Sequence, residues 1–164
     1  MNLRSPAEPV PAGLALDSHL PYRLLTATNA VCRLIGRSYE DRFGLTSPQW
    51  RVMCVLAEEG RANLEVVAQR LIMDRPAVVR AAGGLLRRRL AERCDEDGGG
   101  RGAKLALTLE GARLHGEVAA LALAYEAAMI AGLAPDEVQQ LKRLLARVQT
   151  AALGLAGEAA RASD

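Results

Sequence analysis

The chain of 164 residues has room for one domain with added helices, and 50% of its residues are hydrophobic although only 3% are aromatic. Its core must therefore be built from Leu, Val and Ala on helices. The net charge of +2 and the isoelectric point near 8.6 favour no class of partner by themselves. Three cysteines without CxxC spacing argue against a disulfide framework and against a zinc cluster.

The N-terminal segment 1–17 is proline-rich and lacks an apolar stretch, which predicts a flexible tail and no secretory signal. The most apolar run of the chain, VAALALAYEAAMIAGLA, is interrupted by Glu126 and is too short to predict a membrane span. We therefore expect a cytoplasmic protein without a membrane partner.

A first long helix is predicted from about Pro21 to Arg42, within the segment 18–45. It is followed by Gly44, a residue suited to ending a helix. Apolar residues recur on one side of it at helical spacing: Leu20, Leu24, Ala27, Val31, Leu34 and Tyr39. A helix with such a stripe needs a partner surface.

The segment 46–108 predicts three short helices followed by a β-hairpin. Pro48 and Asn63 mark the starts of the first two helices, and Asp74 with Pro76 marks the start of the third. Glycines 98, 99, 100 and 102 suit a hairpin tip because glycine tolerates positive φ. This order indicates a winged helix-turn-helix, which is a mainly α fold with a small β-hairpin wing.

The third of these helices has two chemically different faces. Its inward face is predicted to carry Val78, Ala81, Ala82 and Leu85. Its outward face, which would meet a DNA major groove, is predicted to carry Arg75, Pro76, Ala77, Val79, Arg80, Gly83 and Gly84. Residues 74–104 hold eight basic side chains against five acidic ones, so positive charge is concentrated here.

Two further helices are predicted in the segment 109–157, and a tail at 158–164 is expected to fray. Steps of three and four residues form a heptad-type seam on the last helix: Val138, Leu141, Leu145, Val148, Ala152 and Leu155. A monomer would expose these stripes as a large apolar surface, which soluble proteins rarely tolerate. The N- and C-terminal helices are therefore predicted to be dimerisation helices of a homodimer.

Four segments resemble, in order, the MarR family of bacterial transcriptional regulators. They are FGLTSPQWRVMCVLAEEG, the two helices predicted to start at Asn63 and Asp74, LLRRRLAERCDED and LALTLEG. The resemblance implies a homodimer that binds pseudo-palindromic operator DNA and is released by a small ligand or by oxidation. Our leading hypothesis is thus a ligand-responsive repressor without a cofactor. An enzyme or a metal site is not indicated, because His19 and His115 are isolated and GGGRGAK lacks phosphate-loop spacing.

Departures from the family pattern support an alternative function that does not involve specific DNA binding. The third helix of the segment 46–108 would be the recognition helix, and it has Pro76, Ala77 and Val79 where the family usually has Ser and Thr. Arg89 replaces the family's glycine before the wing. The alternative is a dimeric ligand-binding or protein-interaction module on the same fold that has lost specific DNA recognition.

The leading hypothesis assigns roles to individual residues. The predicted contacts to double-stranded DNA are Arg75, Arg80, Arg87 and Arg88 on the recognition helix, mostly to phosphates, and Arg101 in the wing tip. Arg80 is the best candidate for contact with a base edge. A small-molecule effector would bind between the dimer helices and the winged motif, where the predicted walls, which are equally plausible as core residues, are Tyr22, Leu24, Tyr39 and Trp50. Cys32 is a candidate peroxide sensor, with a small buried hydrophobe as its other interpretation.

Overall fold

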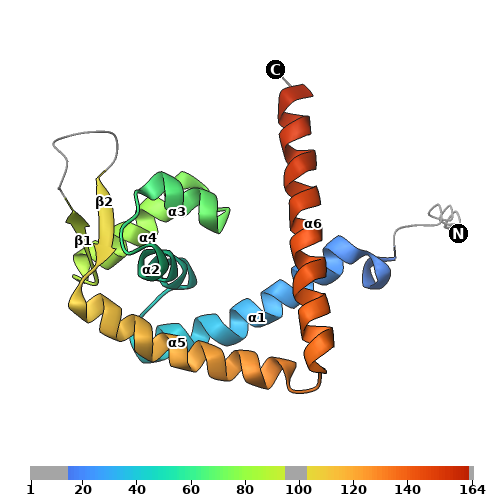
Figure 1. Cartoon of the computed structure of the whole chain (residues 1–164), viewed down its shortest axis with the longest axis horizontal. Helices are drawn as coiled ribbons and strands as arrows, with labels where there is room; N and C mark the ends of the chain where they lie inside the picture. The colour runs from blue at the N-terminus through green and yellow to red at the C-terminus, as the bar shows by residue number, and fades with distance from the viewer. Residues whose placement is uncertain (1–14, 95–102, 163–164) are drawn as a thin grey trace, which may run out of the picture. The chain divides into compact units, whose positions relative to one another are not determined.

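The computed structural model describes residues 15–94 and 103–162, and the chain divides into two compact units, Met1–Val118 and Ala119–Asp164. The element order is η1, α1, α2, α3, α4, β1, β2, α5 and α6 (Figure 1). The mainly helical fold with one small two-stranded sheet confirms the predicted fold class.

Helix α1 spans Leu20–Phe43 after a short 3-10 turn, η1, at Leu16–Ser18. It ends at Gly44, whose φ of 61° is the left-handed conformation that glycine adopts without strain. Tyr39 near this end is buried. Much of the apolar stripe before it, including Val31 and Leu34, is exposed.

Three short helices form the centre of the first unit: α2 at Ser47–Glu59, α3 at Leu64–Leu71 and α4 at Arg75–Arg87. Local signals start them where they were predicted. The Thr46 hydroxyl accepts a hydrogen bond from the Gln49 amide while the Gln49 side chain accepts one from the Thr46 amide, and the Asn63 side chain accepts one from the Val66 amide. These three helices pack on one another around Val52, Val67 and Leu85, which are fully buried.

The wing consists of β1 at Ala91–Cys94 and β2 at Lys104–Leu107. The strands are antiparallel, with Ala91 opposite Leu107 and Cys94 opposite Lys104. Leu105 also exchanges two backbone hydrogen bonds with Ala62, which attaches the wing to the loop before α3. The hairpin tip with Arg101 lies outside the described residues, so its predicted DNA contact stays a prediction.

Helix α5 spans Leu109–Ile130 and begins against the wing. The Thr108 hydroxyl accepts a hydrogen bond from the Gly111 amide at 3.0 Å and donates one to the Arg89 carbonyl at 2.8 Å. A Cβ atom on Gly111 would lie 1.8 Å from the Leu90 carbonyl oxygen. Only glycine therefore allows α5 to pass so close to the chain entering the wing.

Helix α6 spans Pro135–Ala162 and lies in the second unit. All of its residues are described, and none of them is buried. Its seam residues Leu141, Leu145 and Val148 are between 37% and 45% exposed. The helix continues past Gly157, so regular structure extends into the segment that was expected to fray.

Within the described residues, no single helix has the length and apolar character needed to cross a membrane. In this described part of the chain, the bent pair α5 and α6, taken together, has the required length and composition.

Candidate nucleic-acid interface

The outward face of α4 is open to solvent, as its amphipathic pattern predicts. Pro76, Val79 and Arg80 are exposed, and so are Arg75 and Arg87 at the two ends of the helix. The residues predicted to face inward are buried: Val78, Ala81, Ala82 and Leu85. Arginines thus flank an apolar strip along the exposed side of the helix.

Gly84 does not lie on this outward face, which corrects the sequence interpretation. It is buried against α2, and a Cβ atom there would be 2.2 Å from the side-chain nitrogen of Gln49. Gln49 also forms the capping box of α2. Gly84 therefore allows close packing between α4 and the first turn of α2, whereas Gly83 remains on the outer side.

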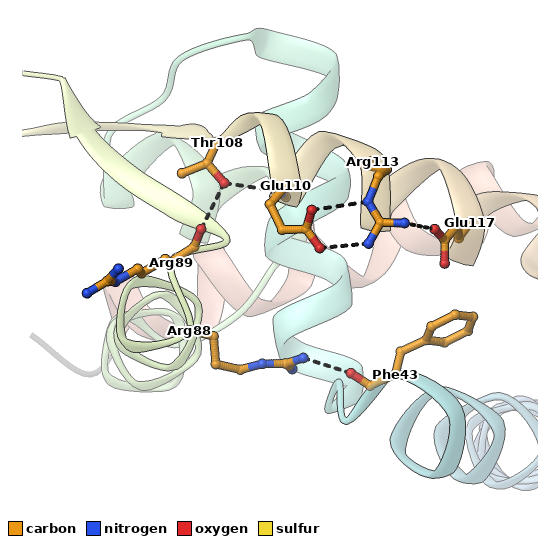
Figure 2. Close-up of polar contacts among 8 residues, drawn as sticks. Phe43, Arg88, Arg89, Thr108, Glu110, Arg113 and Glu117 are labelled. Atoms are coloured by element: carbon orange, nitrogen blue, oxygen red, sulfur yellow. Dashed lines mark hydrogen bonds and ion pairs between the residues drawn. The ribbon is translucent and has the colours of Figure 1, made fainter.

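Arg88 has a structural partner that the sequence did not reveal. Figure 2 shows its side chain reaching to the end of α1, where it donates a hydrogen bond to the Phe43 carbonyl oxygen at 2.8 Å. It also donates one to the Gly44 carbonyl oxygen at 2.7 Å. Carbonyl groups at a helix C-terminus lack partners within the helix, and a cation stabilises them. These contacts give Arg88 a role in joining α1 to α4, separate from its predicted role in DNA binding.

Arg89 occupies the position where the family usually has glycine, and its backbone shows why. Its φ is 56°, in the left-handed region that favours glycine. Its carbonyl oxygen accepts the hydrogen bond from Thr108 (Figure 2). Arg89 thus holds a left-handed backbone conformation that glycine adopts without strain.

A shallow hollow of about 130 Å³ separates α4 from the wing. Its walls are mainly apolar, with one basic residue: Leu64, Val79, Ala82, Gly83, Leu86, Arg93, Ala103 and Leu105. The sequence did not predict this hollow, because its walls come from α3, α4 and both sides of the hairpin.

The predicted effector walls are only partly brought together. The rings of Tyr39 and Trp50 meet edge to face, with centroids 5.5 Å apart. Tyr22 and Leu24 lie at the other end of α1, and 1.5 Å of rise per residue separates Tyr22 from Tyr39 by about 25 Å. One chain therefore does not line a single small pocket with all four residues.

His115 on α5 joins this aromatic pair, a contact that sequence reasoning missed. Its ring stacks on Trp50 with centroids 5.0 Å apart and planes inclined by 22°. Burial lowers the pKa of His115 from its ordinary value, and the negative charge of Glu58 opposes that shift. Tyr39, Trp50 and His115 thus form an aromatic cluster in which the imidazole is biased toward its neutral form.

The cysteines differ in their surroundings. Cys32, the candidate peroxide sensor, is exposed on α1, so its interpretation as a buried hydrophobe does not hold within this chain. Cys54 is half-buried on α2, where burial and the nearby Glu58 carboxylate raise the pKa of its thiol to about 11. Its thiol is therefore protonated and unreactive at neutral pH. Among the described residues, no group of three or more His, Cys, Asp or Glu side chains could hold a metal ion.

Comparison with known proteins found a family match over part of the chain and similar solved structures. Residues 43–102 match the model of the MarR family. A search of curated proteins found no match. The structure is similar to that of the PcaV transcriptional regulator from Streptomyces coelicolor, with 27% identity, a TM-score of 0.75, and coverage of 86% of this chain and 99% of PcaV.

Two further solved structures have the same fold. A MarR/EmrR family regulator from Acinetobacter sp. ADP1 is 21% identical with a TM-score of 0.79, covering 85% of this chain and 98% of that one. S. aureus MepR, solved as a DNA complex, is 19% identical with a TM-score of 0.73, covering 81% of this chain and 97% of MepR. Residues 43–102 are thus a MarR-family region, and the chain has the winged-helix DNA-binding fold of MarR-family transcriptional regulators.

Proposed function

We propose that this protein is a homodimeric, ligand-responsive repressor that binds pseudo-palindromic operator DNA in the cytoplasm. The observation that carries the proposal is the exposed face of α4. It presents Arg75, Arg80 and Arg87, and the helix contains no acidic side chain. A helix with such a face fits a major groove, and arginines bind phosphate and guanine. The MepR complex supports the proposal at the level of the fold.

The homodimer is supported by the unburied seam of α6. A heptad-type stripe on a helix of 28 residues is the pattern that pairs helices, and a second copy of the chain supplies a matching stripe. Twofold symmetry would then present two α4 helices to successive major grooves, about 34 Å apart. This separation would set the spacing of the operator half-sites.

The proposed DNA contacts are shared among the arginines according to their surroundings. Arg80 lies in the middle of the exposed face, so it is the best placed to reach a base edge. Arg75 and Arg87 lie at the helix ends, where they would contact phosphates. Arg88 is occupied by the C-terminal carbonyls of α1, and we assign it to helix capping.

The ligand response is proposed at the aromatic cluster of Tyr39, Trp50 and His115. PcaV was solved with its natural ligand, which supports a small-molecule effector for this chain as well. Tyr22 and Leu24 would reach such a site only from the second copy, since they lie about 25 Å away along their own helix. A ligand that changes the separation of the two α4 helices would lower operator affinity in proportion to its preference for the altered state.

Substitution of Arg80 tests the DNA-binding proposal. Arg80→Ala should weaken binding to a duplex from upstream of the protein's own gene by about 1–3 kcal/mol, as measured by fluorescence anisotropy. Arg147→Ala on α6 is a matched control that removes an exposed arginine from the other unit and should leave affinity unchanged. Equal affinities for the Arg80 variant and the unmodified protein would favour the alternative of an interaction module without DNA recognition.

A further inference from the structure

The hydrogen-bonding side chains of α4 are all of one type. Across the 13 residues of this helix, the only side chains that can form hydrogen bonds are Arg75, Arg80 and Arg87. The others are Pro, Ala, Val, Gly and Leu. Asp74, which precedes the helix, is its N-cap residue. The helix itself therefore offers donors but no side-chain acceptor.

This inventory limits which bases α4 can distinguish directly. In the major groove, arginine pairs with the two acceptors of guanine, whereas adenine is matched by Asn or Gln and cytosine by Asp or Glu. Thymine differs from all of them by its C5-methyl group, which apolar side chains contact. The helix thus has a chemical complement for guanine and for thymine, and for neither of the other two bases.

Val79 is the apolar side chain best placed for such a contact. It is 46% exposed and directly precedes Arg80, whereas the neighbouring Val78 is fully buried. Gly83 follows one helical turn later on the same side, and a Cβ atom there would meet only the Arg87 guanidinium, at 3.5 Å. Because Gly83 has no side chain, nothing projects from the helix beside Val79 at that position, and a base edge can approach Val79 closely.

The surface next to Val79 continues as apolar toward the wing. The hollow between α4 and the hairpin includes Val79 and Gly83 together with Leu64 and Leu86. A methyl group entering from the groove would therefore leave water for a mainly apolar environment, which is favourable.

We propose that Val79 recognises the C5-methyl group of a thymine in each operator half-site, beside the base contacted by Arg80. The proposal rests on the proposed function, since it names the base chemistry that this surface selects. Sequence preference then depends on thymine methyl groups and guanine acceptors.

The test begins with selection of bound sequences from a random duplex library by the full-length protein. The enriched duplex is then made with thymine and with uracil, which lacks only the C5-methyl group. Burial of one methyl group corresponds to about a fourfold change in affinity, so uracil should weaken binding about fourfold per half-site. The Val79→Ala variant should bind the thymine duplex more weakly than the unmodified protein does. Its affinity should change little when uracil replaces thymine.

Two controls separate this effect from general changes in DNA or protein. Leu109→Ala removes another exposed apolar side chain, 91% exposed at the start of α5, and should retain the full response to uracil. Equal binding of thymine and uracil duplexes by the unmodified protein would overturn the inference while leaving DNA binding intact. The inference would also be overturned if replacing thymine by uracil weakened binding of the Val79→Ala variant as much as it weakens binding of the unmodified protein. If no sequence is enriched, the proposed function fails and the inference fails with it.

Discussion

The two units of this chain place their apolar side chains differently. In the first unit, the buried hydrophobic side chains run from Tyr39 to Val118 and hold α2, α3, α4 and the wing together. In the second, the described helix α6 has a regular seam of Leu, Val and Ala, none of which is buried. The first unit supplies its own core, whereas the seam of the second is the surface that we propose pairs with a second copy of the chain.

The largest expected effect comes from placing a charge on that seam. Leu145→Asp should raise the dissociation constant of the homodimer by a factor of about one hundred or more, because an unpaired carboxylate would have to be buried. Thr150→Asp is the matched control, since it adds the same charge on the opposite side of α6. Analytical ultracentrifugation measures both. A dimer unaffected by the Leu145 substitution would show that the seam does not pair the subunits.

A methyl group on Gly111 should damage the first unit instead. Gly111→Ala places a Cβ atom against the Leu90 carbonyl oxygen, so we expect a loss of about 1–3 kcal/mol in the free energy of unfolding. Gly116→Ala on the same helix has nothing within 4 Å of the added atom and should gain about 0.5–1 kcal/mol. Urea denaturation compares the two. Equal stabilities would mean that α5 does not approach the wing as described.

A smaller effect on stability should distinguish the arginine that caps α1 from an arginine that is proposed to contact DNA. Arg88→Ala removes two hydrogen bonds to the end of α1 and should lower the free energy of unfolding by about 1 kcal/mol, given that the side chain is exposed. Arg87→Ala, which removes the neighbouring exposed arginine, should leave stability nearly unchanged. Thermal unfolding followed by circular dichroism distinguishes them, and the reverse order of stabilities would contradict the capping role.

The starts of the helices were predictable from the sequence because their causes are local. Pro48, Asn63 and Pro76 act within one helical turn, and the structure places the starts of α2, α3 and α4 beside them. The positive φ of Arg89 was not predicted, because the sequence showed only that arginine stands where the family usually has glycine.

The remaining features depend on partners far along the chain. Gly84 faces inward because Gln49, on another helix, packs over it. Arg88 binds carbonyls more than 40 residues away, and His115 stacks on Trp50 from α5. Periodicity gives the direction of a side chain relative to its own helix but does not identify the atom it meets.

The most direct test of the central claim is binding to DNA from upstream of the protein's own gene and to a scrambled duplex of equal length, at two salt concentrations. Two concentrations are needed because attraction to phosphates is steep in salt and independent of sequence. Our account predicts a clear preference for the upstream duplex that persists at the higher concentration. Weak and equal binding to both duplexes, and to a library of operator candidates, would contradict it and support the interaction-module alternative.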